Sequence, residues 1–391
     1  MKKFHRFMSY VVVAALASML TLATTRQEPV KDSKLDVLET LILEKFIGEA
    51  DATAMEDAAA AAMIDSLGDR WSYYIPASQY SSYLEQMENS YVGIGVTIQV
   101  MEDGGGFLVT KVNEGGPAEQ AGMLPGDRMV AVDGTDVRLM SSDEASALVK
   151  GQENTTVDIT VNREGEELTL TVTRMLVQVP VATARMLEGN IGLITIANFD
   201  KRCADETIAA IDSLLEQGAE KLIFDVRYNP GGYVTELVDV LNHILPEGEL
   251  FRSVNYKGQE SVDTSDADCV EGIPMAVLVN GSSYSAAEFF AAALREYDYA
   301  IVAGEPTTGK GYFQQTYQLG DGSAVGLSVG KYFTPKGVSL AEEGGLIPDV
   351  VIEVDEETAM AIYAGTLDPM EDPQILAAID AMNNSNLMLI E

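Results

Sequence analysis

The stretch Asn280-Gly-Ser-Ser-Tyr-Ser285-Ala-Ala-Glu288 joins two segments with different hydrophobic patterns. Before it, Met275 to Val279 is a short apolar run that indicates a buried strand, and from Ser285 to Glu296 the pattern is that of a helix. A serine in the first turn of a helix lies beside backbone N–H groups that have no partner within the helix. Those donors and the helix dipole stabilise an alkoxide or a tetrahedral oxyanion. We therefore interpret Ser285 as a candidate nucleophile.

A structural alternative explains the same serines without any chemistry. Ser282, Ser283 or Ser285 could cap the helix, and Glu288, three residues after Ser285, would then complete a capping box. The stretch by itself leaves both interpretations open.

A serine nucleophile needs a base, and the chain has only two histidines, His5 and His243. Lysine is the other base used with serine nucleophiles. It works as a base only if burial and neighbours lower its pKa from about 10.4 to near 7. Lys310 lies between two glycines and before apolar residues, and the amide oxygen of Gln314 could hold its amine without adding charge. The alternative is that Lys310 is a solvated lysine in a turn.

Ser285, Lys310 and Gln314, with the serine and the lysine 25 positions apart, resemble the Ser-Lys-Gln catalytic set of the carboxy-terminal processing proteases of peptidase family S41. The resemblance extends from about Val37 to Val354. It implies a serine endopeptidase in which Ser285 attacks the scissile carbonyl, Lys310 is the base and Gln314 orients Lys310. It implies no cofactor.

Three further motifs are similar to those of the same family. Asp225-Val-Arg-Tyr-Asn-Pro-Gly-Gly232 resembles a family turn, and the resemblance implies that the N–H groups of Gly232 and Ala286 form the oxyanion hole. Tyr332-Phe-Thr-Pro-Lys-Gly337 and Gly345-Leu-Ile-Pro-Asp349 are similar to its closing strand motifs. The four motifs occur in the order expected for the family.

Short alternating segments separated by glycine turns begin at Tyr91 and indicate a small all-β region. Within it, Gly116-Pro-Ala-Glu-Gln-Ala-Gly122 and Pro125 to Gly134 resemble a PDZ domain. Such a domain offers backbone N–H groups to the terminal carboxylate of a peptide and accepts the peptide as an added strand. We expect the carboxylate-binding loop to consist of Tyr91, Val92, Gly93, Ile94 and Gly95.

The expected fold is an α+β multidomain chain with an N-terminal helical arm, a PDZ domain and a crotonase-like α/β serine protease core. Strand, glycine turn and helix alternate after Arg174, which indicates the α/β core. The expected boundaries are 1–30 for a signal peptide or membrane anchor with a linker, 31–88 for a helical or cap region, 89–174 for the PDZ domain, 175–355 for the protease core and 356–391 for a C-terminal helical segment.

Composition excludes some functions. The formal net charge is −36, with 61 acidic and 25 basic residues, so the clusters of lysine and arginine that bind nucleic-acid phosphates are not expected. Cys203 and Cys269 are isolated, and a disulfide between them is possible but not required. The sequence has neither a Cys-x-x-Cys nor a His-Glu-x-x-His motif, so it predicts no metal site.

The N-terminus predicts a location outside the cytoplasm. Met1 to Arg6 is positively charged, and Phe7 to Ala23 is an apolar run of borderline length for crossing a membrane. Either a cleaved signal peptide or an uncleaved anchor fits this pattern. We expect the catalytic part to be secreted or anchored to the cell membrane and to act on proteins or peptides with accessible C-termini. The family resemblance also suggests a homodimer.

A competing hypothesis is a non-catalytic PDZ scaffold whose enzyme-like core only binds peptides. A degenerate core would tolerate loss of at least one member of the catalytic set. Ser285, Lys310 and Gln314 are all present, which favours the enzyme.

Overall fold

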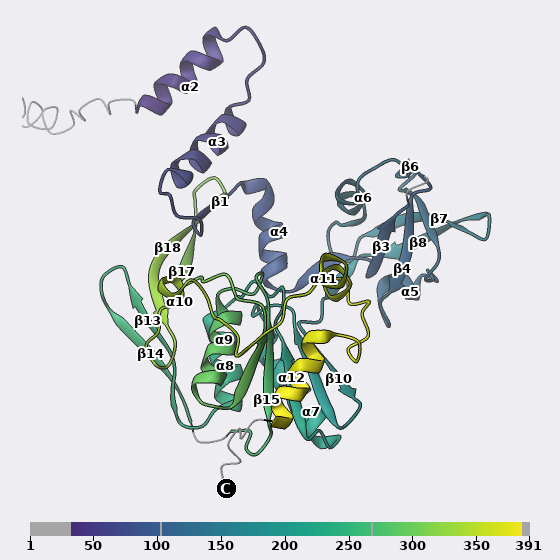
Figure 1. The fold of residues 1–391 in the computed structure, drawn as a ribbon. Coiled ribbons are helices and arrows are strands. Elements are labelled where there is room, and N and C mark those ends of the chain that lie inside the picture. The colour runs from purple at the N-terminus through teal and green to yellow at the C-terminus, as the bar shows by residue number, and fades with distance from the viewer. Residues whose placement is uncertain (1–32, 102–103, 267–268, 385–391) are drawn as a thin grey trace, which may run out of the picture. The chain divides into compact units, whose positions relative to one another are not determined.

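In a computed structural model of the chain, the structure describes residues 33–101, 104–266 and 269–384 (Figure 1). The chain divides into two compact units, residues 1–70 and 71–391. The described part of the first unit contains helices α2 (Lys34–Lys45) and α3 (Ala52–Asp65). The predicted signal or anchor lies outside the described residues. Over the described ranges, the structure has no helix of the length and apolar character needed to span a membrane.

The second unit contains a six-stranded sheet that positions the candidate site. Strands β11, β12, β15, β16 and β19 of this sheet run parallel to one another, and β10 pairs antiparallel with β11. All five residues of β15 are buried, as is usual for a parallel sheet covered on both faces. In spatial order the strands are β10 (Ala182–Leu187), β11 (Ile191–Ile196), β12 (Lys221–Asp225), β15 (Met275–Val279), β16 (Ala300–Gly304) and β19 (Val350–Val351).

Helices cover both faces of this sheet because successive strand residues point to opposite sides. On β15, Met275, Val277 and Val279 join one hydrophobic cluster, whereas Ala276 and Leu278 join another. The first cluster includes helices α7 (Cys203–Glu216), α8 (Val234–Ile244) and α9 (Ala286–Glu296), and the second includes α12 (Pro373–Asn384).

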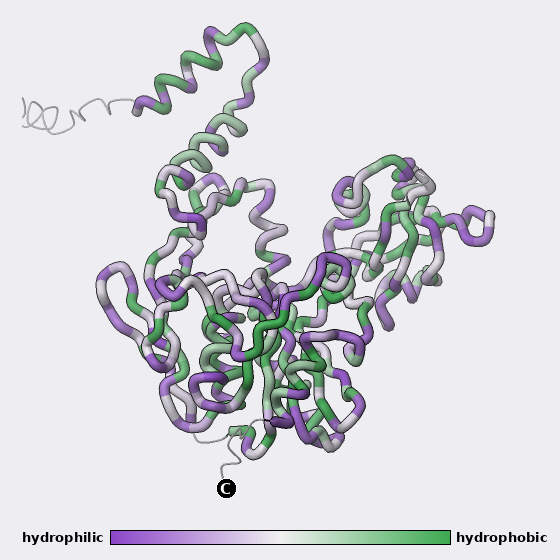
Figure 2. Tube along the Cα trace, viewed as in Figure 1, coloured by the Kyte–Doolittle hydropathy of each residue, from purple (hydrophilic) through white to green (hydrophobic). Residues whose placement is uncertain are grey.

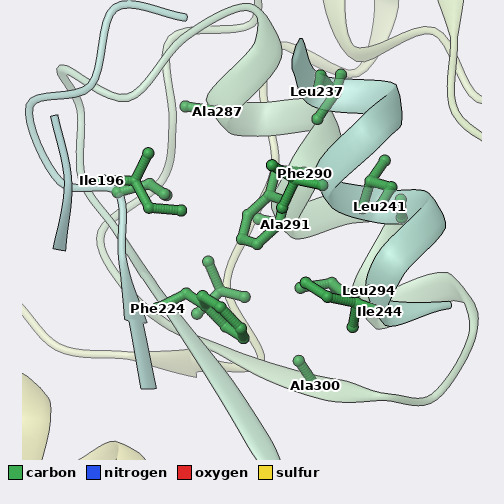
Figure 3. Close-up of a cluster of buried hydrophobic side chains, with 14 of the residues drawn as sticks. Ile196, Phe224, Leu237, Leu241, Ile244, Ala287, Phe290, Ala291, Leu294 and Ala300 are labelled. Carbon is green, nitrogen blue, oxygen red and sulfur yellow. The ribbon is translucent and has the colours of Figure 1, made fainter. Parts of the chain in front are cut away.

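Phe290 on α9 occupies the centre of the first cluster. Its ring lies 5.3 Å from that of Phe224 in an edge-on arrangement, and Figure 3 shows Leu237 and Leu241 of α8 on its other side. Figure 2 shows that hydrophobic residues concentrate in the central strands and in the helices against them. Helix α9, which begins directly after Ser285, is thus fixed by the largest apolar cluster of the described chain.

A second, antiparallel sheet contributes other residues of the site. It contains the hairpin formed by β17 and β18. Gln314 lies on β17 next to a register shift, and Tyr332 lies near the end of β18. The strands are β1 (Tyr73–Ile75), β13 (Gly248–Asn255), β14 (Glu260–Ser265), β17 (Tyr312–Gln318) and β18 (Ala324–Phe333).

The region resembling a PDZ domain has its own sheet and its own hydrophobic cluster. One expectation there is wrong. Tyr91, Val92 and Gly93 were expected in a loop, but they belong to strand β2 (Ser90–Gly93), which pairs with β9 (Met175–Gln178). The loop is therefore limited to Ile94 and Gly95. The other elements are β3 (Val96–Val100), β4 (Phe107–Val112), α5 (Pro117–Gln120), β5 (Arg128–Val132), β6 (Thr135–Asp136), α6 (Ser142–Val149), β7 (Thr156–Arg163) and β8 (Glu166–Thr173).

The C-terminal segment is not one continuous helix. It forms α11 (Glu356–Tyr363) and α12, with Gly365 and Pro369 in the connection between them, and both residue types disfavour a helix interior. Residues 385–391 lie outside the described chain. The remaining helices are α4 (Ala77–Met87) and α10 (Leu340–Glu343). Cys203 and Cys269 are both free thiols, so the disulfide left open by the sequence is not formed.

Candidate active site

Three loops meet at one edge of the parallel sheet. Strands β12, β15 and β16 are neighbours, and each is followed by a segment that carries a sequence-predicted site residue. The carboxyl ends of parallel strands lie at the same edge, which is where ligands usually bind in open α/β sheets. The turn ending at Gly232 follows β12, Ser285 follows β15, and Lys310 follows β16. The topology therefore brings together segments that are far apart in the sequence.

Ser285 occupies a sharp turn between β15 and α9. Its backbone has φ 59° and ψ −127°, a conformation that non-glycine residues rarely adopt and that is often found at functional sites. The residue is buried, with 7% of its surface exposed. Gly231 lies against this turn, because a Cβ on it would come within 2.7 Å of Cβ of Ser285 and within 2.9 Å of the nitrogen of Ala286. Only glycine allows this approach.

Glu288 connects the serine turn to the lysine loop. Its Oε2 atom accepts hydrogen bonds from the backbone N–H groups of Ser285 and Lys310, each at 2.9 Å. Its Oε1 atom accepts from the N–H of Gly309 at 2.6 Å and from the hydroxyl of Thr307. Burial raises the pKa of this carboxyl, while the four hydrogen bonds lower it and leave a net increase. The expected bond from Glu288 to the start of α9 is therefore present and is part of a larger network.

Other hydrogen bonds fix the turn after β12 against the turn after β15. Oδ1 of Asn280 accepts from the N–H of Tyr228 at 3.0 Å, and the N–H of Tyr284 donates to the carbonyl of Asn229 at 3.1 Å. The hydroxyl of Ser283 donates to the carbonyl of Val226 at 2.7 Å. Because such buried hydrogen bonds are costly to break, the two turns form one rigid assembly.

The hydroxyl of Ser285 is hydrogen-bonded to the hydroxyl of Tyr332, with 2.7 Å between the oxygens. Burial raises the pKa of the Tyr332 phenol above its ordinary value, so the phenol stays protonated at neutral pH. Across the described ranges, the structure contains no hydrogen bond between Oγ of Ser285 and Nζ of Lys310. The expected serine–lysine contact is therefore not formed in this conformation, and the two residues belong to adjacent loops.

The side chain of Lys310 extends over two aromatic rings. Its Nζ atom lies 4.9 Å from the ring centre of Trp71 and 5.8 Å from that of Tyr284. The two rings are themselves 5.8 Å apart. Trp71 and Tyr284 therefore provide apolar surroundings for this lysine. The faces of these rings attract a cation.

Gln314 lies on β17 of the second sheet, and its contacts differ from those expected. Its Nε2 atom donates to the carbonyl of Tyr312 at 3.2 Å and to the hydroxyl of Ser328 at 3.0 Å. Among the described residues, its amide oxygen forms no hydrogen bond with Lys310. The side chain is thus held by its own hairpin.

Two expected oxyanion donors lie beside the serine turn. Ala286 is the first residue of α9, so its N–H has no acceptor within the helix. Gly232 is exposed and has φ 155°, and a Cβ on it would meet the carbonyl carbon of Phe199 at 2.2 Å. A Cβ on Gly231, which precedes Gly232, would lie 2.9 Å from the nitrogen of Ala286. The backbone of this turn and the start of α9 are therefore adjacent.

A groove in the PDZ-like region includes four of the five residues expected to bind a peptide. Its volume is about 330 Å³, and Tyr91, Gly93, Ile94 and Gly95 line it together with α6 residues such as Val149. Val92 is not among the residues that line it. Nζ of Lys150, which also lines the groove, lies 5.5 Å from the ring centre of Tyr91. The groove thus combines an apolar strand edge with one cation.

Several residues of the site had no role assigned from the sequence. Tyr332 belongs to a motif that resembles one of the family, and Trp71 is the only tryptophan of the chain. Neither feature of the sequence indicates which residue the side chain contacts. Asp200 follows Phe199, which bridges to Gly232, and its Oδ1 atom is buried without a hydrogen-bond partner among the described residues. Burial and then the nearby Glu236 raise the pKa of Asp200 to about 7. Across the same residues there is no cluster of side chains suited to hold a metal ion.

Comparison with known proteins identifies two families within the chain. The family profile for Peptidase family S41 matches residues 190–352, and the profile for the PDZ domain matches residues 108–163. The chain is 34% identical over 363 residues to the carboxy-terminal processing protease CtpA of Bacillus subtilis, covering 90% of this chain and 77% of that protein. It is 30% identical over 354 residues to the carboxyl-terminal-processing protease of Synechocystis, covering 88% of this chain and 80% of that protein.

A solved structure supports the fold. A Bacteroides fragilis protein assigned to the S41 proteases superimposes with a TM-score of 0.52 and 15% sequence identity, covering 89% of this chain and 97% of that one. At this level of identity the likeness concerns the fold alone. The mixed α/β fold of this chain is thus found in another protein.

Proposed function

Because this chain belongs to the carboxy-terminal processing proteases of peptidase family S41, and is therefore a serine-type peptidase, we propose that it cleaves protein substrates recognised through their C-termini. The proposed chemistry is acyl transfer by Ser285 with Lys310 as the base. The observation that carries this proposal is the convergence of the Gly232, Ser285 and Lys310 loops at the carboxyl ends of three adjacent parallel strands.

In the proposed reaction, Oγ of Ser285 attacks the scissile carbonyl while the neutral amine of Lys310 accepts the hydroxyl proton. The N–H groups of Gly232 and Ala286 bind the oxyanion of the tetrahedral intermediate. Lys310 then gives its proton to the leaving amine, and the carbon–nitrogen bond breaks to leave an acyl-enzyme. Water attacks the ester with Lys310 again as base, which releases the new carboxylate and restores the serine.

In this mechanism Gln314 orients Lys310. Support for this role is its position on a strand of the hairpin that begins two residues after Lys310. In the conformation described, Gln314 donates to Tyr312 and Ser328, so its contact with Lys310 requires the lysine side chain to move from the aromatic rings. We expect Gln314→Ala to lower kcat by about 10- to 100-fold, less than loss of the lysine.

Proteolysis of an unfolded protein tests the catalytic assignment. The full chain in mild detergent is incubated with casein beside Ser285→Ala and Lys310→Ala, and each is expected to lower the rate by at least about a thousandfold. The matched controls are Ser282→Ala, an exposed serine in the same loop, and Lys331→Ala, a lysine whose Nζ lies 5.8 Å from the ring centre of Tyr312. Proteolysis that survives in both catalytic-site variants would overturn the assignment.

We also propose that the PDZ-like groove binds substrate C-termini and controls access to the site. Its support is the apolar strand edge at Ile94 and Gly95 with Lys150 nearby, which suits a peptide ending in a carboxylate. A C-terminal peptide with a free carboxylate should accelerate cleavage of a second substrate, whereas its amidated form should do so much less. A flat dose response to the free peptide would remove the gating role.

The domain limits and the cellular location are likewise proposals. We propose the boundaries 89–174 for the PDZ domain and 175–355 for a core of the crotonase-like class, and an extracytoplasmic location directed by residues 1–30. The apolar run from Phe7 to Ala23 supports this location. Fractionation of cells expressing the full chain and a chain lacking residues 1–30 tests it, and equal export of both would contradict it.

The first unit supports a proposed homodimer. Helix α2 exposes a row of apolar side chains, and exposed apolar surfaces often mark interfaces. Light scattering of the full chain in detergent tests the assembly, with Leu38→Lys and Leu41→Lys expected to give a monomer. A monomer for the unaltered chain would remove the proposal. The exposed apolar residues are Leu35, Val37, Leu38, Leu41, Leu43 and Phe46.

A further inference from the structure

Tyr332 is the hydrogen-bond partner of the proposed nucleophile in the structure. Its hydroxyl lies 2.7 Å from Oγ of Ser285, and only 3% of the residue is exposed. The N–H of Tyr332 donates to the carbonyl of Gly311, the residue after Lys310. Tyr332 thus contacts the proposed nucleophile through its side chain and the residue after the proposed base through its backbone.

The ring of Tyr332 is held rigidly, so its hydroxyl cannot easily move away from Ser285. The ring centre lies 4.6 Å from that of Phe289 in an edge-on arrangement and 5.4 Å from that of Phe251. The ring of Phe313 is nearly parallel to it at 6.0 Å. Aromatic contacts of this kind fix a ring in one position. A change of partner must therefore come from rotation of the Ser285 side chain.

The side chain of Lys310 also lies against aromatic rings in this conformation. Its Nζ atom lies over the rings of Trp71 and Tyr284, whose faces stabilise an ammonium ion. An ammonium ion has no lone pair to accept a proton from serine. Both members of the pair are therefore engaged with aromatic side chains, Ser285 with a phenol and Lys310 with two ring faces.

We propose that Tyr332 is a positioning residue that withholds the Ser285 hydroxyl from Lys310 in the resting enzyme. This inference rests on the proposed Ser285–Lys310 chemistry and adds its resting-state control. Release requires Oγ of Ser285 to rotate from Tyr332 toward the amine of Lys310 after that amine leaves the aromatic rings. Tyr332 is thus not a base in the reaction but a competitor for the nucleophile.

Either direction of the hydrogen bond slows the attack. If Ser285 donates to Tyr332, its single proton is directed away from Lys310. If Tyr332 donates to Ser285, the phenol occupies one of the two lone pairs of Oγ and makes the oxygen a weaker nucleophile. Burial raises the pKa of Tyr332, so the phenol remains neutral and cannot replace Lys310 as the proton acceptor at neutral pH. One neutral hydrogen bond changes such an equilibrium by about twofold to tenfold.

The test is the rate at which a serine-directed probe labels the full chain in mild detergent without peptide or substrate. A fluorophosphonate probe forms a covalent bond to Oγ and releases fluoride, so its second-order rate constant measures how available the nucleophile is. Tyr332→Phe removes the hydroxyl and keeps the ring that contacts Phe251, Phe289 and Phe313. We expect labelling of Ser285 to become about twofold to tenfold faster in this variant.

Tyr297→Phe is the matched control, because the Tyr297 hydroxyl donates to the carbonyl of Glu249 and its ring packs against the same core. It should lose a similar hydrogen bond and leave the labelling rate unchanged. An equal or slower rate for Tyr332→Phe, in a protein whose Tm matches that of Tyr297→Phe, would overturn the inference.

The proposed function fails in a different way. If the unaltered chain and Ser285→Ala are labelled equally, Ser285 is not the nucleophile and the assignment of the site is wrong. If Ser285 is labelled only when Lys310 is present, but Tyr332→Phe does not increase the labelling rate, the Ser285–Lys310 pair is supported and the role of Tyr332 is wrong. Labelling that is faster in Tyr332→Phe and lost again in Tyr332→Phe with Lys310→Ala supports both.

Discussion

Oε2 of Glu288 accepts a hydrogen bond at 2.9 Å from the backbone N–H of Lys310. The same oxygen accepts one from the N–H of Ser285, so a single buried atom fixes the distance between the loops of the proposed nucleophile and base. The other oxygen receives the N–H of Gly309 and the hydroxyl of Thr307. Four donors therefore face one carboxylate, which must be deprotonated to accept all of them.

Glu288→Gln should lower kcat by about a hundredfold or more and destabilise the fold by about 1–3 kcal/mol. A glutamine has one oxygen and one NH₂ group. Two of the four N–H and O–H donors would therefore face the NH₂ group, which cannot accept their hydrogen bonds. Casein cleavage and thermal unfolding measure the two effects. The control is Glu296→Gln on the same helix, where the carboxylate accepts from Thr334 and Lys336. It should lower stability without a comparable loss of activity, and equal activity losses in both variants would contradict the role of Glu288.

Gly231→Ala should abolish proteolysis because its methyl group would collide with the serine turn. Gly231 has φ 91° and Gly218 has φ 90°, so both substitutions carry a similar backbone penalty of about 1–2 kcal/mol. A Cβ on Gly218 has nothing within 4 Å, whereas one on Gly231 would lie 2.7 Å from Cβ of Ser285. The difference between the two variants in unfolding free energy and in kcat therefore measures the contact alone. Equal values for both would show that the close approach has no effect.

The elements around the site follow from local sequence patterns. The apolar run at Met275–Val279 is β15 with the expected bounds, and the helix expected from Ser285 is α9, which begins at Ala286. Strands β11 and β12 likewise lie in the region after Arg174, where strands and glycine turns were expected to alternate. These features are local because burial of a strand and the start of a helix depend on residues close in sequence.

The contacts of the catalytic side chains could not be predicted in the same way. Trp71 and Lys310 come together through the second sheet, in which Tyr73 pairs with Gly326. The Ser285–Tyr332 bond similarly depends on where β18 lies relative to α9. Such registers are set by packing between distant segments and leave no periodic signal in either one. The rotamer of Ser285 is even harder to predict from sequence, because the energy of one hydrogen bond decides it.

Asp200→Asn should stabilise the protein at pH 8 and have little effect near pH 4. The pKa of this carboxyl is about 7 in the folded chain, against about 3.9 when unfolded. The folded state therefore binds the proton more tightly, and stability falls as the pH rises from about 4 to 7. Asparagine avoids this penalty, which is on the order of 2–4 kcal/mol above pH 7. Unfolding midpoints at pH 4.5 and 8 measure it, with Asp239→Asn on exposed helix surface as the control. A gain that does not depend on pH would contradict the shifted pKa.

Arg227→Met should destabilise the core more than Asp372→Asn does. The guanidinium of Arg227 is buried between Asp225 at 2.6 Å and Asp372 at 2.8 Å, and it also donates to Oε1 of Gln374 at 2.8 Å. Removing it leaves two carboxylates without their cation, which costs about 3–5 kcal/mol when the charges are buried. Asp372→Asn keeps the Oδ1 atom that accepts from the N–H of Gln374 at the start of α12, and it leaves Arg227 paired with Asp225. Denaturant unfolding of both single variants and of the double variant gives the coupling energy. If Asp372→Asn is as damaging as Arg227→Met, the helix start and not the ion pair determines the stability of this region.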